Sequence, residues 1–270
     1  MFSVHEETGP GLIIWHPKGS GIRYLFEDFW RDEHYYRGYD LVYTPNIGRA
    51  NLWETSRHLE YFKENMFAPS ETDGQDYYLK PMNCPFHIMI YKSELRSYRD
   101  LPVKFAEIGT VYRYERSGVL HGLFRARGFT QDDAHIFCTL EQIESEVDQV
   151  VDLTIAFLKA FGFSDYEIFV STRPEKFVGS EDDWVKATDA LKSALNNKGL
   201  AFSVDDGGGA FYGPKIDLKI NDVIGRSWQC STVQVDFNLP KRFDLNYICL
   251  LYTSDAADDT PCVDLGGRRI

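Results

Sequence analysis

The sequence predicts an α+β domain in which helices flank a mainly antiparallel sheet. Two β-rich runs, residues 103–115 and 125–137, are joined by a connection that contains glycine and serine, which favours a long antiparallel hairpin. An amphipathic helical pattern follows over residues 143–158. Strands and helices do not alternate regularly as they do in parallel α/β proteins, so a dinucleotide-binding fold is not expected.

The first predicted helix follows apolar residues at helical spacing near the start of the chain. Ser20 is available as its N-cap, and Gly38 is placed to end it. A strand over residues 41–44 is expected next, ending at Pro45. The apolar positions of the helix are Ile22, Leu25, Phe26, Phe29 and Trp30.

Two later helices carry clear end signals. Thr139 and Gln142 form a capping box before the helix that ends near Gly162. Ser180 and Asp183 can cap the second helix, and Gly199 can adopt the left-handed conformation that ends it. Both helices are expected to be packing elements. Two further strands are predicted over residues 215–220 and 227–237.

Composition and charge limit the possible functions. The 270 residues are 43% hydrophobic and 26% charged, as in ordinary globular proteins, and no apolar run is long enough to span a bilayer. A net charge of -12 argues against a surface that holds nucleic acid by bulk electrostatics. The five cysteines are scattered along the chain, which fits reduced thiols, so we expect a cytoplasmic protein.

One face of the predicted hairpin is polar. Side chains alternate across a strand, so Arg113 and Glu115 share a face of the first strand. A nucleotide site needs guanidinium groups for phosphate, a ring that stacks on the base and carboxylate acceptors. An exposed face of paired charges is the alternative interpretation. The other face is mostly small and is expected to be closely covered. The polar face of the second strand carries Arg125, Arg127, Phe129, Gln131, Asp133 and His135.

Residues 109–137 closely resemble the second signature motif of class II aminoacyl-tRNA synthetases, in its bacterial-type threonyl form. The resemblance implies ATP and magnesium as ligands. It places Arg113, as a catalytic residue, at the α-phosphate and Arg125 at the γ-phosphate. Glu115 would contact the adenine end, and Phe129 would stack on the base. Arg113 and magnesium would stabilise charge that develops during the in-line reaction.

The segment Lys-Pro-Met-Asn-Cys-Pro at residues 80–85 resembles another part of the same family's active site. It implies that Cys84 and His135 bind a catalytic zinc ion whose open positions accept the amino and hydroxyl groups of threonine. A lone cysteine or histidine is more often a core residue, so this assignment depends on both motifs. His87 completes a Cys-x-x-His spacing, but the family does not use that position and we do not assign it.

The resemblance also implies residues that contact threonine and the adenylate. Asp133 would accept the proton of the threonine hydroxyl, and valine, which lacks this group, should be rejected. Strict alternation places Gln229 on the opposite face from Thr232 and Gln234, so we expect either a bulge or a contact through the backbone. The remaining assignments are Lys215 as a catalytic residue, Gln229 and Thr232 at the nucleotide, and Met82, Gln131, Tyr212 and Gln234 at the substrate.

Two macromolecular partners follow from the resemblance. The region from Ile22 to Pro45 is similar to the family's first motif, which builds a twofold interface, so a homodimer is implied. The second partner is tRNA(Thr), which receives threonine after its activation by ATP. No membrane contact is expected.

The resemblance extends over residues 1–247, which we interpret as an incomplete class II catalytic core. The family continues with a strand that carries a third zinc histidine and a helix that carries an ATP-site arginine. Residues 248–270 instead resemble a translated sequencing adapter, and we interpret them as an aberrant, non-native tail. We therefore expect weakened zinc and ATP binding, and we do not expect full activity from this chain. The family's editing and anticodon-binding domains are not expected in it either.

Two other functions fit parts of the sequence. A seryl or prolyl class II synthetase would share the arginine and glutamate of the hairpin, but Cys84 and His135 in their threonyl contexts argue against it. A non-catalytic, synthetase-like binding module would be expected to have lost ATP-site residues. Arg113, Glu115 and Phe129 are all present, which favours the enzyme.

Overall fold

The computed structural model describes residues 1–249, and the chain forms two compact units. Unit 1 consists of Met1–Leu95 and Val103–Phe137, and unit 2 consists of Arg96–Pro102 and the described residues from Cys138 to Cys249. Six of the eight strand pairs among the described residues are antiparallel, so the predicted fold class is confirmed. From residue 250 onward, the predicted tail lies outside the described residues.

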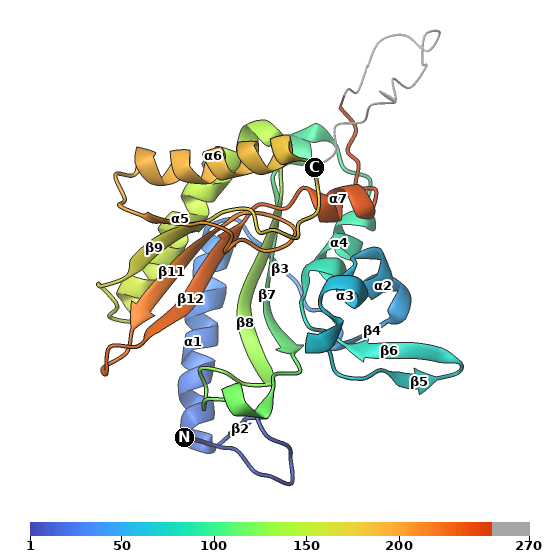
Figure 1. Ribbon diagram of the computed structural model, residues 1–270, viewed down its shortest axis with the longest axis vertical. Coiled ribbons are helices and arrows are strands. Elements are labelled where there is room, and N and C mark those ends of the chain that lie inside the picture. The colour runs from blue at the N-terminus through green and yellow to red at the C-terminus, as the bar shows by residue number, and fades with distance from the viewer. Residues whose placement is uncertain (250–270) are drawn as a thin grey trace. The chain divides into compact units, whose positions relative to one another are not determined.

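The predicted hairpin is the centre of unit 1. It is formed by β7 (Val103–Tyr112) and β8 (Gly128–Phe137), and its register places Glu107 opposite Asp133 and Val111 opposite Phe129. Both strands are shorter at the loop end than expected, because the chain between them turns through a short 3-10 helix, Ser117–Val119. The long ribbon is visible in Figure 1.

Helix α1 (Pro17–Tyr36) covers the small-residue face of the hairpin (Figure 1). Arg23 Nη2 donates to Thr130 Oγ1 at 2.9 Å, and Trp30 Nε1 donates to Asp132 Oδ1 at 2.5 Å. Ala126 on this face is buried, but Asp132 and Ala134 are exposed, so the prediction that the face is closely covered holds for only part of it.

The ends of α1 confirm one sequence prediction and correct another. Gly38 adopts φ +80 just after the helix, as its predicted role as a stop signal requires. Ser20 is not the N-cap, because the helix begins at Pro17 and His16 precedes it without a side-chain capping bond. Proline suits the first turn of a helix because it lacks an N–H that would otherwise have no partner there.

Helix α4 (Cys84–Lys92) packs against the polar face of the hairpin. Asn83 Nδ2, just before the helix, donates to Asp133 Oδ2 at 2.8 Å, and the ring of Tyr91 stacks on Phe137 at a centroid distance of 4.6 Å. Gly109 permits this approach, because a Cβ atom there would lie 2.2 Å from Asn83 Nδ2. The sequence pattern did not identify this helix.

The predicted strand over residues 41–44 is mostly wrong. Only Asp40–Leu41 forms a strand, β3, which pairs in parallel with β7. Beyond it the chain turns inward, so that Thr44 hydrogen-bonds to a buried carboxylate of the hairpin. The other elements of unit 1 are β1 (Phe2–Ser3), β2 (Ile14–Trp15), β4 (Ile47–Arg49), α2 (Ala50–Thr55), α3 (His58–Tyr61), β5 (Ser70–Thr72) and β6 (Gln75–Leu79).

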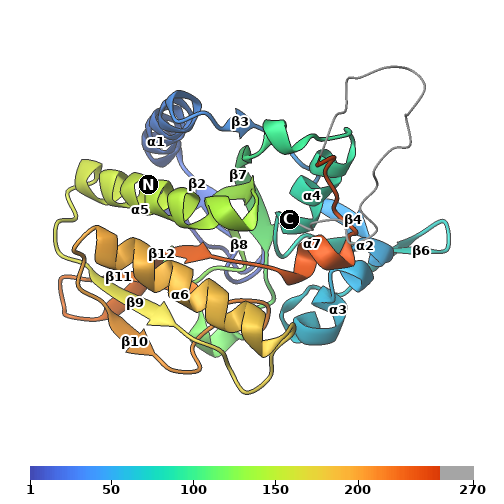
Figure 2. The ribbon, with the colours of Figure 1, turned by 90° about the horizontal axis from the view of Figure 1, so that it is seen from above.

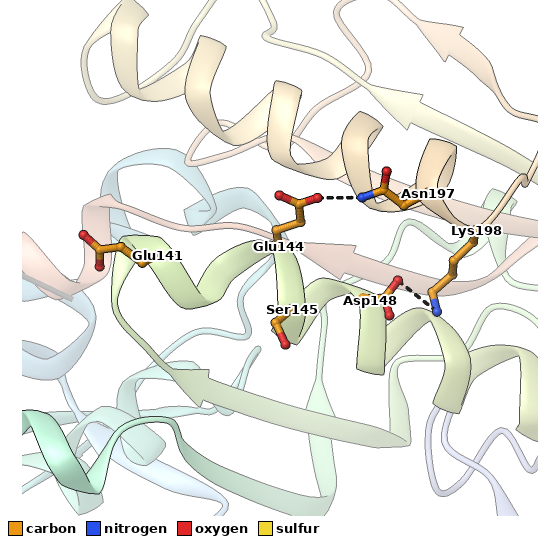
Figure 3. Close-up of a pocket in the computed structure, with 6 residues that line it drawn as sticks. All are labelled: Glu141, Glu144, Ser145, Asp148, Asn197 and Lys198. Atoms are coloured by element: carbon orange, nitrogen blue, oxygen red, sulfur yellow. Dashed lines mark hydrogen bonds and ion pairs between the residues drawn. The ribbon is translucent and has the colours of Figure 1, made fainter.

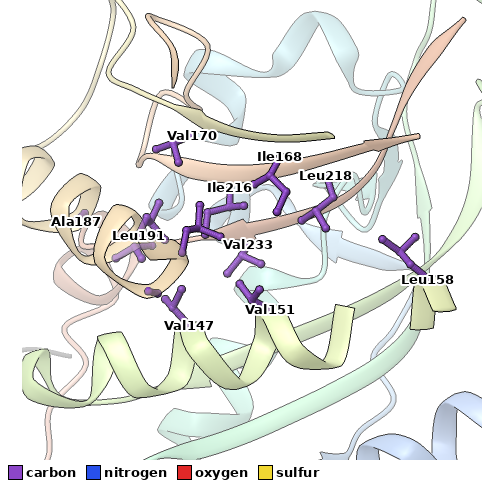
Figure 4. Close-up of a cluster of buried hydrophobic side chains, with 13 residues drawn as sticks. Val147, Val151, Leu158, Ile168, Val170, Ala187, Leu191, Ile216, Leu218 and Val233 are labelled. Carbon is purple, nitrogen blue, oxygen red and sulfur yellow. The ribbon is translucent and has the colours of Figure 1, made fainter. Parts of the chain in front are cut away.

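Unit 2 is a four-stranded sheet with two helices on one face, as Figure 2 shows. The sheet order is β10-β9-β11-β12, and side chains from both helices and three of the strands form one hydrophobic core (Figure 4). The elements are α5 (Ile143–Ala160), β9 (Glu167–Ser171), α6 (Glu181–Asn197), β10 (Ser203–Asp205), β11 (Lys215–Asn221), β12 (Ser227–Gln234) and α7 (Asn238–Arg242).

The predicted caps of both unit 2 helices are confirmed. Thr139 and Gln142 make the reciprocal bonds of a capping box before α5, and the Ser180 side chain accepts a hydrogen bond from the backbone N–H of Asp183. Gly162 and Gly199 adopt φ +84 and +65 after the two helices. Local sequence therefore sets where these helices begin and end.

A β-bulge lies between β11 and β12. Leu218 pairs with Ser231, but the next residue, Lys219, pairs with Gln229, so Cys230 is the extra residue. Of the two expected explanations for Gln229, a bulge is therefore the correct one. The last predicted strand is three residues shorter than expected, because it ends at Gln234. Within residues 1–249, the helices are too short or too polar to cross a membrane.

Candidate functional site

A guanidinium group and an aromatic ring lie together at the end of the polar hairpin face. The Cζ atom of Arg113 is 5.2 Å from the ring centroid of Phe129 and 5.8 Å from that of Phe62. Arg113 Nε donates to the carbonyl oxygen of Pro81 at 3.1 Å, which fixes the base of the side chain. A cation for phosphate and a flat surface for a base are thus adjacent.

Glu115 and Arg125 form an ion pair with each other. Arg125 Nη2 lies 3.2 Å from Glu115 Oε2, and 54% of the Arg125 side chain is exposed. An exposed pair of this kind contributes little to stability. Arg127 Nε donates to the backbone oxygen of Glu115 at 2.8 Å, and its Cζ lies 4.8 Å from the ring centroid of Tyr114. The loop end of the hairpin is held by these contacts.

The two predicted metal ligands belong to elements that pack together. Cys84 is the first residue of α4, and His135 is on the hairpin face that contacts this helix. The Nδ1 atoms of His135 and His87 are 2.8 Å apart. Loss of hydration lowers the pKa of His135 to about 4, which keeps the ring neutral at pH 7. A neutral imidazole and a cysteine thiolate are ligands that zinc prefers, so these two residues fit the ion.

Among residues 1–249, no group of three or more His, Cys, Asp or Glu side chains is arranged to hold a metal ion. The described part of the chain therefore provides two predicted protein ligands, Cys84 and His135. The chain contains no histidine after His135. The expected third histidine thus has no counterpart in this sequence.

Glu107 is a buried carboxylate connected through His87 to the predicted ligand His135. His87 Nε2 lies 3.1 Å from Glu107 Oε2, the Thr44 hydroxyl donates to the same oxygen at 2.9 Å, and Lys80 Nζ lies 3.4 Å from Oε1. Burial opposes ionisation, but the bonds from His87 and Thr44 and the charge of Lys80 lower the pKa of Glu107 to about 2. His135 is therefore hydrogen-bonded to His87, which is hydrogen-bonded in turn to an ionised glutamate.

Sequence reasoning missed Glu107 and set His87 aside. Both are fully buried in the structure, and neither was assigned a role. The available signal was a carboxylate within an otherwise apolar strand run, together with the Cys-x-x-His spacing. The spacing did mark a relevant histidine, but as a neighbour of the predicted ligand His135.

The predicted threonine contacts of unit 1 follow the same face. Asp133 accepts a hydrogen bond from Asn83, while Gln131 lies opposite Gly109 and is half-buried. The Sδ atom of Met82 is 3.2 Å from His58 Nε2. These side chains come from the hairpin and from the segment that leads into α4.

The predicted contacts of unit 2 gather around β11 and β12. Lys215 Nζ, Gln229 Nε2 and Thr232 Oγ1 all lie within 3.0 Å of the carboxylate of Asp217, a residue that the sequence did not single out. Separately, Tyr212 donates from Oη to Gln234 Oε1. The bulge at Cys230 brings Gln229 to the side of Thr232.

A cavity of about 580 Å³ in unit 2 contains none of the predicted site residues. It lies between α5 and α6, where Asn197 donates to Glu144 at 2.7 Å and Lys198 pairs with Asp148 at 2.9 Å (Figure 3). Four of its six lining residues are paired in this way, and its geometry does not indicate a reaction. The lining residues are Glu141, Glu144, Ser145, Asp148, Asn197 and Lys198.

The fourteen predicted site residues thus form two sets, each described within its own unit. Nine are on the hairpin and the segment around Cys84 in unit 1, and five are on or beside β11 and β12 in unit 2. Within unit 1, Phe129, Gln131, Asp133 and His135 share one strand face, and within unit 2 Gln229 and Thr232 share a face with Asp217.

Comparisons with known proteins identify the family. The family model described as tRNA synthetase class II core domain (G, H, P, S and T) matches residues 65–253. The threonine–tRNA ligases of Nitrosococcus oceani and Magnetococcus marinus are 61% and 60% identical over 248 residues, which is 92% of this chain and 38% of each relative. The chain therefore spans well under half the length of the curated relatives it matches.

A solved structure gives the same result in three dimensions. The crystal structure titled as the RNA binding domain of threonyl-tRNA synthetase from Cryptosporidium parvum Iowa II aligns with a TM-score of 0.88 at 43% identity. The alignment covers 93% of this chain and 62% of that chain. The family model, which matches more than half of the sequence, shows that the chain belongs to the class II tRNA synthetase core family.

Proposed function

We propose that this chain is the catalytic-core segment of a threonine–tRNA ligase. The complete enzyme would activate threonine with ATP to threonyl-adenylate and transfer threonine to tRNA(Thr). The observation that carries the proposal is the register of β7 and β8, which aligns Phe129, Gln131, Asp133 and His135 on one face, with Arg113 beside Phe129. The high identity to threonine–tRNA ligases supports it.

The nucleotide would bind at the loop end of the hairpin in unit 1. Arg113 holds the α-phosphate, and adenine stacks on Phe129 in place of the guanidinium that now lies near this ring. The ion pair of Glu115 and Arg125 opens, so that the carboxylate accepts the exocyclic amine of adenine and the guanidinium binds the γ-phosphate. Magnesium would neutralise the phosphate charge that these two arginines do not reach.

Zinc would bind Cys84 and His135. The ion acts as a Lewis acid that holds the amino and hydroxyl groups of threonine when it is bound. His87 occupies Nδ1 of His135, which leaves Nε2 as the ligating nitrogen. Asp133 accepts the hydroxyl proton of threonine, and the amide group of Asn83 holds its carboxylate in place.

The remaining assignments follow the family resemblance. Met82, Gln131, Tyr212 and Gln234 are assigned to threonine. Lys215, as a catalytic residue, stabilises charge on the adenylate, and Gln229 and Thr232 bind the nucleotide. Charge stabilisation by an oriented cation is the larger of these effects, because the reacting phosphate carries the developing charge.

Amino-acid-dependent pyrophosphate exchange, together with calorimetric binding of ATP and threonine, tests the function. We expect threonine to give the highest signal, and Arg113→Ala to lower exchange or ATP binding about 100-fold, since a charge-assisted phosphate contact is lost. Arg116→Ala, in the same exposed loop, is the matched control and should change neither. Exchange that depends on proline or serine would favour the related synthetases. Failure to bind both ATP and threonine would refute the proposal.

We infer a homodimer through the region from Ile22 to Pro45. Helix α1 and the residues after it carry large apolar side chains that are strongly exposed, including Leu25 at 69%, Phe26 at 52% and Tyr43 at 86%. Exposed apolar surface of this extent is typical of an interface. Sedimentation velocity should show a dimer that Leu25→Glu converts to a monomer, whereas Lys18→Glu near the start of the helix should leave it unchanged.

We also propose the cytoplasm as the compartment. The cysteines of the described chain form no disulfide with one another, which fits a reducing environment. Mass spectrometry of the alkylated protein, purified without reductant, should find Cys84, Cys138, Cys230 and Cys249 labelled as thiols.

A further inference from the structure

Asp217 is a buried carboxylate in unit 2 that accepts hydrogen bonds from four side chains. It lies on β11 between the core residues Ile216 and Leu218, and only 2% of its surface is exposed. No role was assigned to it on the basis of sequence. The four donors are Lys215, Ser171, Gln229 and Thr232.

The donors fill both oxygens of the carboxylate. Oδ2 is 2.8 Å from Lys215 Nζ and 2.9 Å from Ser171 Oγ, and Oδ1 is 2.7 Å from Gln229 Nε2 and 3.0 Å from Thr232 Oγ1. An ionised carboxylate has about four acceptor positions, so Asp217 has none left for a substrate. Any effect it has on substrate must act through these neighbours.

Three of these neighbours are residues that the proposed function places at the adenylate. Gln229 uses its Nε2 for Asp217 and, at 2.6 Å, for Thr232 Oγ1, which leaves its carbonyl oxygen as an acceptor for a ligand. Lys215 uses one ammonium proton for Asp217 and keeps two. One anion thus orients both a cation and an acceptor.

The β-bulge is needed for this arrangement. Without the extra residue Cys230, Gln229 and Thr232 would be on opposite faces of β12, and only one of them could reach Asp217. The sulfur of Cys230 lies 3.3 Å from the backbone oxygen of Leu218, so the bulged residue itself points to another partner. Bulges often re-aim a side chain at a binding site in this way.

We propose that Asp217 is a positioning residue for adenylate binding, which holds Lys215, Gln229 and Thr232 in one fixed arrangement. The inference rests on the proposed function for the identity of the ligand. Lys215 then presents its ammonium group to an anionic phosphate oxygen, and Gln229 presents its carbonyl oxygen to a hydroxyl or amino donor. Ser171, which is completely buried, supports the carboxylate from the neighbouring strand β9.

The first experiment does not depend on activity. Competitive acetylation followed by mass spectrometry measures the reactivity of each lysine, and in the wild type Lys215 should react more slowly than Lys219, which lies on the same strand against the ring of Phe169. In Asp217→Asn the amide places an N–H₂ group among the four donors, so Lys215 should become at least threefold more reactive. Lys219 should not change.

The second experiment measures binding of a non-hydrolysable threonyl sulfamoyl adenosine by calorimetry. Asp217→Asn should weaken it about 10- to 100-fold, as expected for losing the orientation of charge-assisted contacts. Ser171→Ala removes a bond to the same carboxylate but moves no assigned contact, so it should stay within about twofold of the wild type. Adding Lys215→Gln to Asp217→Asn should weaken binding by less than the two single changes together predict.

These measurements separate failure of the inference from failure of the proposed function. If the wild type does not bind the analogue, the proposed function is wrong, and the labelling of Lys215 still decides whether Asp217 holds it. If Asp217→Asn does not fold, equal reactivity of Lys215 and Lys219 in the wild type overturns the inference, and slower Lys215 supports it. Equal losses of binding in Asp217→Asn and Ser171→Ala would show a structural role alone and would also overturn it.

Discussion

Glu107 in unit 1 and Asp217 in unit 2 are equally buried, each with 2% of its surface exposed, but they hold different kinds of partner. Glu107 binds Thr44, Lys80 and His87, which are themselves buried, and reaches an assigned residue only through His87. Asp217 binds assigned residues directly. A buried anion with only buried partners should act mainly on stability, whereas one with partners at the surface should act mainly on binding.

Replacing Glu107 is the largest expected change. Glu107→Gln removes the charge that balances Lys80, whose pKa burial already lowers, and should cost about 3–5 kcal/mol of unfolding free energy. Urea denaturation measures it. Adding Lys80→Met should recover part of the loss, because no unpaired cation then remains. Asp217→Asn should cost clearly less, since Lys215 keeps 15% of its side chain exposed and can turn to water. Equal losses would remove the distinction between the two carboxylates.

Lowering the pH should change the stability of the two units in opposite directions. Burial, together with the charge of Arg113, lowers the pKa of His58 to about 4, and burial lowers that of His135 to about 4. The unfolded chain therefore takes up protons below about pH 6.5 that folded unit 1 refuses, so its stability falls as pH drops from 6.5 to 4. Each histidine contributes up to about 3 kcal/mol to this loss of unfolding free energy. In unit 2, burial raises the pKa of Asp236 to about 6, although hydrogen bonds from two backbone N–H groups act to lower it.

The raised pKa of Asp236 has the opposite effect on stability as the pH falls. The folded state takes up this proton below about pH 6 and the unfolded chain only near 3.8, so unit 2 gains stability over this range as pH falls. Hydrogen exchange, corrected for intrinsic rates, should show β7 and β8 losing protection from pH 6.5 to 4 before β9 and β11 do. His58→Gln should reduce the loss in unit 1. Simultaneous loss in both units would contradict the assignment of these groups.

A methyl group at Gly109 should disturb unit 1 by an intermediate amount. Gly109→Ala places a Cβ atom 2.2 Å from Asn83 Nδ2, and the amide must move away from Asp133 to relieve it. We expect a loss of about 1–3 kcal/mol in thermal or urea unfolding. Gly213→Ala in unit 2 is the matched comparison, because its Cβ would lie 1.9 Å from the backbone oxygen of Val235. Backbone cannot turn away, so Gly213→Ala should cost more.

The smallest expected effect concerns the two serines predicted as helix caps. Ser180→Ala removes the bond to the N–H of Asp183 at the start of α6 and should cost about 1 kcal/mol. Ser20 lies inside α1, so Ser20→Ala should be neutral or slightly stabilising, since alanine is the better helix former. Urea midpoints of the two variants give the comparison. A comparable loss for Ser20→Ala would mean that α1 begins later than the structure places it.

Much of the scaffold could be predicted because its signals are local. Capping boxes, stop glycines and strand alternation depend on residues a few positions apart, and these predictions are confirmed for both unit 2 helices and for the hairpin. The length of strand β3 was overestimated, because Thr44 forms a hydrogen bond with Glu107, which belongs to another part of the chain. A bond between residues 63 positions apart leaves no trace in local composition.

The sequence by itself determined the family, the polar hairpin face and the identity of the residues on it, since these depend on residue type and on the two-residue period of a strand. Only the tertiary structure decided how these residues are supported. Glu107 and Asp217 each look like an ordinary charged position within a strand, yet each collects donors from other strands or from segments outside the sheet. Burial of a carboxylate costs free energy unless such donors converge, and convergence is set by packing.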